Sequence, residues 1–172
     1  FRSTFFDDIL SFPAGCMGEI KNSNIKIQKY WKLDISKKKQ FDKEEFQEIF
    51  LNNIKLHLRS DVPIAFTLSA GLDSSSIVKS SIDSSLKDYK AFSLLSNFDE
   101  ENDEKNFIKE FIKQNSLKHS FFNAHDHIEE NVLEKIIFFQ DEPIQHTSFL
   151  NQFLLRQKIH NEGYKVLLVG EG

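Results

Sequence analysis

The sequence predicts an α/β fold, an open parallel sheet with helices on both faces. Short apolar runs of strand length alternate along the chain with longer segments whose apolar residues recur at helical spacing. The apolar runs are continuous and do not alternate with polar residues, as expected for strands covered on both faces. This repeated strand-helix-strand order is typical of parallel sheets, which bind ligands at the carboxyl ends of their strands.

The first 35 residues differ from the rest of the chain. A turn signal, Pro13-Ala14-Gly15, precedes two extended candidates at residues 16–20 and 25–33, which the polar turn 21–24 separates. This pattern predicts a hairpin and a connecting strand, with no core of its own. We therefore expect a short β segment at residues 1–35 and an α/β domain at residues 36–172.

The α/β domain is predicted element by element. Its first helix begins near Asp42, which can act as a cap, and ends near Arg59, before Pro63. Apolar runs then predict strands at residues 63–68, 89–95, 118–123 and 165–169. Helical periodicity predicts helices at residues 74–86, 104–115, 126–139 and 148–161. Asp126 and Glu129 form a capping box for the third of these helices, and Gly163 fits the position after the last.

The loop Phe66–Ser76, FTLSAGLDSSS, joins the first strand to the first helix that packs on the sheet. Gly71 can take a positive φ at little cost. The N–H groups from about Leu72 to Ser75 are unpaired at the helix start, and with the helix dipole they make an anion site. On local chemistry alone, an ordinary capped helix explains the loop nearly as well.

Side chains of the loop sharpen this interpretation. Ser69, Ser74 and Ser75 supply hydroxyl donors. Asp73 would repel a phosphate, so its presence makes sense if it holds a divalent cation that bridges to the phosphates. The loop lacks the Gly-Lys-Ser/Thr ending of the Walker loop and the G-x-S-x-G elbow of serine hydrolases.

The stretch Ser69–Ser75 resembles the S-G-G-x-D-S loop of the N-type ATP pyrophosphatases, called the PP-loop. More narrowly, Asp61-Val62-Pro63 before the loop and Leu72 within it resemble the glutamine-hydrolysing asparagine synthetases. Further stretches resemble the same family, in the same order along the chain. The end of a glutaminase domain resembles Phe5–Gly15, and the linker after it resembles Tyr30-Trp31. Two synthetase signatures resemble Asp141-Glu142-Pro143 and Gly170-Glu171-Gly172.

The resemblance implies an adenine nucleotide alpha-hydrolase-like fold and a ligase that uses ATP and Mg²⁺. Such enzymes activate the side-chain carboxylate of aspartate as an acyl-adenylate, and ammonia from glutamine then attacks it to give asparagine and AMP. It also implies a glutaminase domain in the same, longer chain, and a homodimer is compatible with it. Because the chain begins at Phe1 and stops at Gly172 directly after an apolar run, we expect a piece of a longer protein.

Site residues follow from the same resemblance, position by position. The loop residues would hold the pyrophosphate and Asp73 the magnesium ion. Glu171 matches an acidic residue that takes a proton from the attacking ammonia. The positions that match pyrophosphate and nucleotide contacts are Leu68, Ser69, Gly71, Asp73, Ser74, Ser75, Leu94, Val169 and Gly170.

Departures from the family pattern leave alternatives open. Ala70 replaces a glycine, at a cost of roughly 1–2 kcal/mol if that position is left-handed and little if it is not. Val169 stands where serine is usual, and the stretch Ile144–Ser148 is unusual, so a related adenylating enzyme with another carboxylate substrate is an alternative, as is an inactive nucleotide-binding fragment.

Asp141 and Glu142 are either structural or part of the substrate pocket. Glu104 opens the helix after the second strand, where a solvated helix start competes with a functional role.

Composition excludes several classes. A net charge of −4 with scattered Lys and Arg argues against nucleic-acid binding. The apolar runs are too short to span a bilayer, so no membrane partner is expected. The single cysteine, Cys16, cannot build a disulfide framework or a four-ligand zinc site, which fits a reducing, cytoplasmic location.

Overall fold

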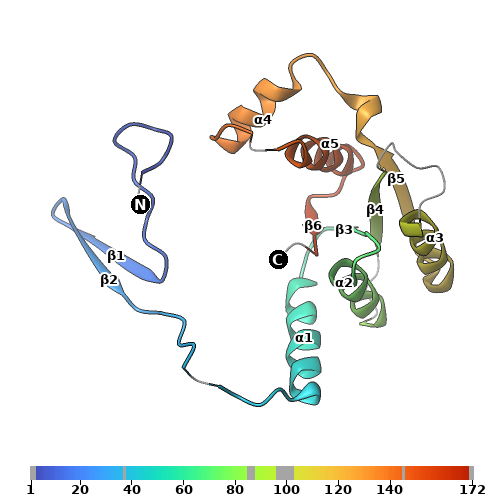
Figure 1. Ribbon diagram of the computed structural model, residues 1–172, viewed down its shortest axis with the longest axis horizontal. Coiled ribbons are helices and arrows are strands. Elements are labelled where there is room, and N and C mark those ends of the chain that lie inside the picture. The colour runs from blue at the N-terminus through green and yellow to red at the C-terminus, as the bar shows by residue number, and fades with distance from the viewer. Residues whose placement is uncertain (1–2, 37, 85–87, 96–102, 145, 171–172) are drawn as a thin grey trace. The chain divides into compact units, whose positions relative to one another are not determined.

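The computed structural model describes residues 3–36, 38–84, 88–95, 103–144 and 146–170. The chain forms two compact units, Phe1–Asp42 and Lys43–Gly172 (Figure 1). Each unit has its own sheet. Within the described residues, none of the helices combines the length and apolar character that crossing a bilayer requires.

The first unit is built around the predicted hairpin. Strand β1 (Cys16–Lys21) pairs antiparallel with β2 (Asn24–Lys29), so that Ile20 lies opposite Ile25. The two loop residues, Asn22 and Ser23, both have positive φ, which is the turn geometry that matches the twist of a two-residue hairpin. Ile20 and Ile25 are 75% and 64% exposed, so the hairpin buries no core of its own.

The second unit contains a four-stranded parallel sheet in the order β5-β4-β3-β6. Its strands are β3 (Ile64–Thr67), β4 (Tyr89–Leu95), β5 (His119–Asn123) and β6 (Val166–Leu168). From β3 the chain moves to β4 and β5 on one side, and β6 then pairs on the other side of β3. The direction of winding therefore reverses between β3 and β6, the position at which open sheets of this class bind ligands.

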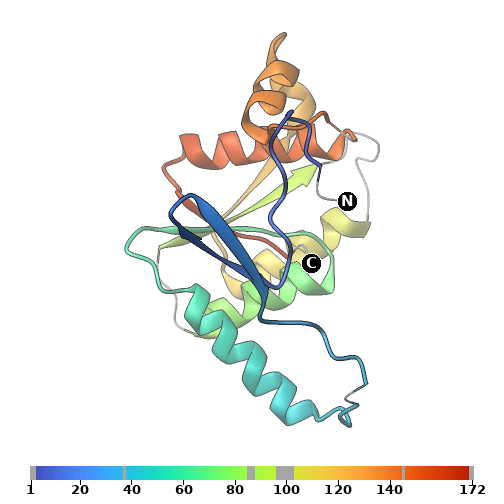
Figure 2. The same ribbon diagram turned by 90° about the vertical axis from the view of Figure 1, so that its left-hand side faces the viewer.

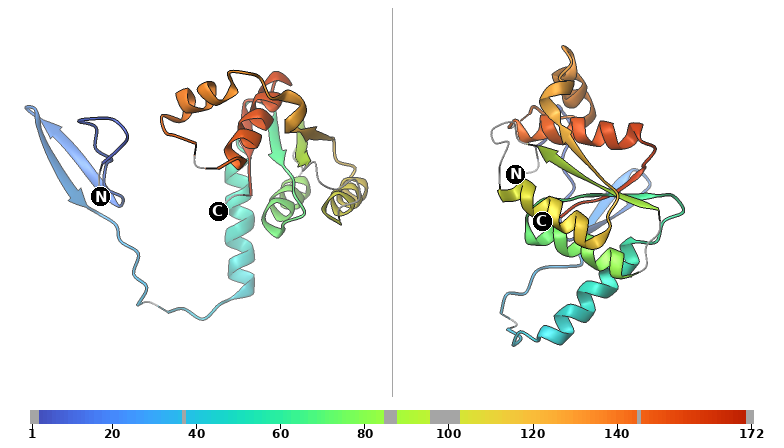
Figure 3. Two further views of the ribbon diagram at one scale, coloured as in Figure 1. Left: turned by 45° about the horizontal axis from the view of Figure 1, so that its top comes forward. Right: turned by 90° about the vertical axis from the view of Figure 1, so that its right-hand side faces the viewer.

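Helices cover both faces of this sheet (Figures 2 and 3). On one face α1 (Lys43–His57), α2 (Leu72–Asp83) and α3 (Asp103–Asn115) lie together, and on the other α4 (Val132–Gln140) and α5 (Ser148–Asn161). Successive strand residues alternate between the two cores, as strand geometry requires. Ile64 and Phe66 of β3 join Val78 and Ile108 in one core, whereas Ala65 joins the other. The predicted fold class is confirmed.

Element bounds agree closely with the sequence prediction in most places. β4 and α5 have the predicted bounds, and the others differ by three residues or fewer at either end, except α4 and β2, which ends at Lys29 and not at residue 33. Gly163 follows α5 with φ +92°, and its N–H donates to His160 O while the N–H of Tyr164 donates to Ile159 O. This pair of bonds is the Schellman motif expected for a glycine after a helix.

The helix predicted at residues 126–139 is wrong at its start. Residues Ala124–His127 form a short 3₁₀ helix, η1, and α4 begins only at Val132. The Asn123 side chain accepts a hydrogen bond from the N–H of His125 and so caps η1, and Ile128 is extended. Asp126 therefore lies inside the 3₁₀ turn and cannot cap α4, whose N-cap is Asn131.

Candidate nucleotide-binding site

The loop Phe66–Ser76, which is predicted to bind pyrophosphate and is called the pyrophosphate loop below, joins β3 to α2, but its backbone needs no left-handed residue. Gly71 is the N-cap of α2 with φ −70° and ψ 152°, which is extended, so the loop does not use the positive φ that a glycine can take at little cost. Ala70 is not among the described residues with positive φ. An alanine at this position is therefore unstrained, and the substitution for glycine carries little cost.

Serine hydroxyls close the loop on itself. The Ser74 Oγ accepts from the N–H of Ser69 at 3.1 Å and lies 2.8 Å from the Ser69 Oγ. Ser74 is buried, and its hydroxyl also reaches the carbonyl oxygens of Ser69 and Gly71. The Ser75 Oγ donates to the carbonyl of Gly71 at 2.8 Å. These hydroxyls therefore shape the loop.

The start of α2 leaves backbone donors available. The N–H of Ser75 donates to Gly71 O and closes the first helical turn. Among the described residues, no acceptor is recorded for the N–H groups of Leu72 and Asp73. Together with the helix dipole, these donors favour an anion at this end of α2.

A buried polar pair anchors the loop to β4. Leu68, the residue after β3, donates its N–H to Phe92 O, and its carbonyl oxygen accepts from the Ser93 hydroxyl. Ser93 is fully buried, and its Oγ lies 2.8 Å from Nε2 of His119. Because the Ser93 hydroxyl has one proton and gives it to Leu68, His119 must donate from Nε2. Burial, with the positive charge of Lys90, lowers the pKa of His119 from 6.5 to about 4, so this imidazole is neutral near pH 7.

Gly170 brings the end of β6 against the start of α2. An added Cβ at Gly170 would lie 2.5 Å from the Ser74 nitrogen and 3.0 Å from the carbonyl carbon of Asp73. No side chain fits at such distances to a backbone, so only glycine allows this approach. The contact places Gly170, two residues after β6, beside the pyrophosphate loop, where the winding of the sheet reverses.

A cavity of about 340 Å³ opens at this point, a size typical of small-ligand pockets. The carboxyl ends of the strands, the pyrophosphate loop and α5 line it. Of the residues expected to contact ATP, the cavity is lined by Leu68, Ser69, Ser74, Leu94, Val169 and Gly170. The structure thus brings most of the predicted set to one place.

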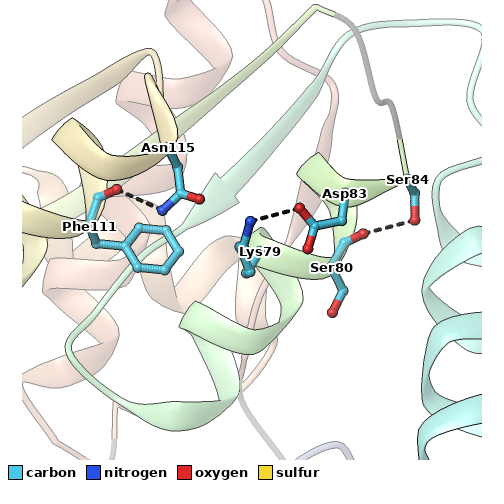
Figure 4. Close-up of polar contacts among 6 residues, drawn as sticks. All are labelled: Lys79, Ser80, Asp83, Ser84, Phe111 and Asn115. Carbon is cyan, nitrogen blue, oxygen red and sulfur yellow. Dashed lines mark hydrogen bonds and ion pairs between the residues drawn. The ribbon is translucent and has the colours of Figure 1, made fainter.

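Asp73 and Ser75 face a different cavity. This space of about 860 Å³ lies between α1, α2 and α3 and also touches Val169 and Gly170. Its wall includes Lys79, Ser80 and Phe111. Lys79 forms an ion pair with Asp83 at 2.7 Å, and Ser80 accepts from Ser84 (Figure 4). Residues of the pyrophosphate loop that are predicted to bind ATP therefore line both cavities. Gly71 lines neither of them.

Sequence reasoning missed the α5 wall of the smaller cavity. Its polar lining residues are Ser148, Asn151, Gln152 and Arg156. These residues recur at helical spacing, which indicates a polar stripe on one helix face. They fall between apolar core positions such as Leu155 and belong to no motif, so the stripe was not recognised as part of a site. Glu104, noted as a candidate, does reach the loop: its Oε1 accepts from the Ala70 N–H at 3.4 Å.

Asp73 fits a magnesium ion only in one manner. Among the described residues, no three His, Cys, Asp or Glu side chains gather as a metal site. Mg²⁺ commonly binds through one or two carboxylates, several waters and the oxygens of substrate phosphates. A carboxylate in the first turn of α2 suits that mode, so Asp73 would hold the ion together with the phosphates.

Other residues singled out in the sequence either fall outside the described residues or line neither cavity. Glu171, the expected proton acceptor, lies outside the described residues, as do Gly172 and Gln145. Asp141 is the C-cap of α4 with φ 58°, and neither it nor Glu142 lines either cavity, which favours the structural alternative. His146 stacks on Phe149 and lies 2.6 Å from the hydroxyl of Ser148.

Comparison with known proteins places the chain in a family. The sequence profile described as Asparagine synthase matches residues 45–172. A curated relative, Amidase chyE from Penicillium rubens, is 23% identical over 197 aligned positions, which cover 98% of this chain. The chain spans only 28% of the length of that relative.

Solved structures share the fold. The NH3-dependent NAD synthetase from Campylobacter jejuni is 14% identical with a TM-score of 0.51, over 76% of this chain and 56% of that one. The U34-tRNA thiolase NcsA from Methanococcus maripaludis is 17% identical with a TM-score of 0.52, over 74% and 46%. Since the family profile covers most of the sequence, the chain belongs to the asparagine synthase family, whose members use ATP.

Proposed function

We propose that this chain is the ATP-binding synthetase part of an enzyme that joins a carboxylate to ammonia, with aspartate as the acceptor and asparagine as the product. The observation that carries the proposal is the contact of Gly170 with the start of α2. It brings the ends of β3 and β6 together beside a ligand-sized cavity, at the point where sheets of this class bind nucleotides.

In the proposed reaction, the aspartate carboxylate attacks the α-phosphorus of ATP and pyrophosphate leaves. Ammonia then displaces AMP from the β-aspartyl-AMP intermediate. The leaving pyrophosphate carries concentrated negative charge, so donors fixed before the reaction stabilise its departure. The N–H groups at the start of α2 are such donors. The hydroxyls of Ser74 and Ser75 would turn from the loop carbonyls, and that of Ser69 from the Ser74 hydroxyl, to the phosphate oxygens.

The remaining roles are proposed from the residues that line the two cavities and, for Glu171, from the family resemblance alone. Leu68, Leu94 and Val169 give the smaller cavity apolar surface for the adenosine. Asp73, with Mg²⁺ and the phosphates, would offset the charge of the leaving group. Glu171 would take the proton that ammonia loses on attack.

The first unit is proposed to be the end of a glutaminase domain that supplies the ammonia. Its hairpin exposes apolar side chains such as Ile20 and Ile25, which suits a segment that packs on a larger domain. The domain boundary after residue 35, a cytoplasmic location and a homodimer stay predictions.

A second candidate keeps the adenylation step and changes the carboxylate. The α5 wall favours it, because Ser148 lies in the unusual stretch Ile144–Ser148 and lines the cavity. The name amidase for the relative from Penicillium rubens does not specify an aspartate substrate.

ATP–pyrophosphate exchange in the full chain tests both candidates. Exchange that depends on aspartate is the expected result. Exchange with another carboxylate, and none with aspartate, selects the second candidate. If no acidic amino acid or other carboxylate supports exchange, the proposed ligase activity is wrong.

A further inference from the structure

We propose that Glu104 makes the pyrophosphate loop selective for phosphate groups that carry a bound divalent cation. The inference rests on the proposed function, because it takes the loop to be the site of the pyrophosphate part of ATP. It concerns a residue that no loop motif contains, since Glu104 lies 34 positions after Ala70.

The contact between Glu104 and the loop is direct. Its Oε1 accepts a hydrogen bond from the N–H of Ala70 at 3.4 Å, and its side chain lines the smaller cavity with Ser69 and Ser74. Glu104 lies in the first turn of α3, the helix that follows β4. Its carboxylate therefore reaches the loop from a different helix than α2. A carboxylate oxygen thus lies where a phosphate oxygen would accept from the same N–H.

Charge decides what can bind beside this carboxylate. One N–H cannot serve two anions, and two negative charges at contact distance in an exposed site repel each other. Arg156 brings a positive charge to the cavity lining and Glu104 a negative one, so the described lining has no net charge to offset a polyphosphate. The Glu104 carboxylate therefore repels a metal-free polyphosphate, and this repulsion lowers its affinity on the order of tenfold.

A divalent cation removes this conflict. When the phosphates carry Mg²⁺, the cation offsets their charge wherever it is bound on them, so the Glu104 carboxylate no longer faces an uncompensated polyanion. Glu104 then costs the metal-bound ligand little and excludes the metal-free one. If Glu104 were only a solvated helix start, its charge would not affect either ligand.

Titration calorimetry of the full chain with inorganic pyrophosphate tests this, in excess Mg²⁺ and in excess chelator. The variant Glu104→Gln keeps the shape of the side chain and removes its charge. Glu110→Gln is the matched control, since Glu110 is an exposed residue of the same helix and is absent from the cavity lining. ATP serves as a second probe under the same conditions.

We expect the wild-type chain to bind pyrophosphate at least about tenfold more tightly with Mg²⁺ than without it. Glu104→Gln should bind metal-free pyrophosphate about tenfold more tightly than the wild type does, while Glu110→Gln behaves as the wild type. If Glu104→Gln binds pyrophosphate with the same ratio of affinities, with and without Mg²⁺, as the wild type, this inference is wrong and the proposed function is unaffected. A wild-type chain that binds neither pyrophosphate nor ATP in either condition overturns the proposed function as well.

Discussion

Replacing Gly170 with alanine should separate the end of β6 from the pyrophosphate loop. The new Cβ would lie 2.5 Å from the nitrogen and 2.7 Å from the Cα of Ser74. Because carbon atoms rest about 3.5–4.0 Å from their neighbours, the two segments must move apart by roughly 1 Å. Overpacking of this kind costs about 1–3 kcal/mol of folding free energy.

The expected effect on activity is larger than the effect on stability. A displacement of about 1 Å near reacting groups lowers a rate roughly a hundredfold, so ATP–pyrophosphate exchange by Gly170→Ala should fall by that order. Gly163→Ala is the matched control: its Cβ meets nothing within 4 Å, but φ is +92°. This strain costs about 1 kcal/mol at a site remote from the loop, so exchange should be unchanged.

Urea denaturation gives the stability of both variants, and exchange gives their activity. If Gly170→Ala keeps wild-type exchange, the close approach of β6 to α2 does not build the site. If both variants lose exchange in proportion to stability, the effect of Gly170 is one of folding alone.

Further perturbations test the surroundings of the loop. Ser93→Ala removes the hydroxyl that donates to the Leu68 carbonyl and should cost about 1–3 kcal/mol of unfolding free energy, measured by urea denaturation; an equally stable variant would show that the buried bond contributes nothing. The pKa of His119 is lowered from 6.5 to about 4 on folding, so the unfolded chain binds more protons between these values and stability should fall as pH drops from 6.5 towards 4. His119→Gln should flatten that slope in thermal melts, and an identical slope would assign it to other groups. Arg156→Gln should weaken ATP binding about tenfold in calorimetry, since a charged donor leaves the cavity wall; unchanged affinity would place the nucleotide away from α5.

The fold was predictable where local pattern and packing agree. Strand β4 and helix α5 have the bounds that their apolar runs and periodicity indicate. The start of α4 was not predictable in this way, because Asp126 and Glu129 imitate a capping box. The Asn123 side chain instead caps a 3₁₀ turn, a choice between two local hydrogen bonds that spacing alone does not settle.

The site was predictable only in part. The motif located the loop and the residue Gly170, but the reason for Gly170 is a contact between segments nearly one hundred positions apart, which only the fold reveals. The same holds for Glu104 at the loop and for Ser93 beneath it. Gly71 could take a positive φ, but its backbone is extended, a choice that the sequence leaves open and the fold decides.

The proposed binding of pyrophosphate at the start of α2 is tested most directly by amide resonances. In ¹H–¹⁵N spectra of the full chain, addition of magnesium pyrophosphate should shift the signals of Leu72 and Asp73 strongly, because their N–H groups would donate to the ligand. The hairpin residues Ile20 and Ile25 should not respond. Unchanged signals for Leu72 and Asp73 at saturating pyrophosphate, or shifts confined to other segments, would contradict the assignment of this loop.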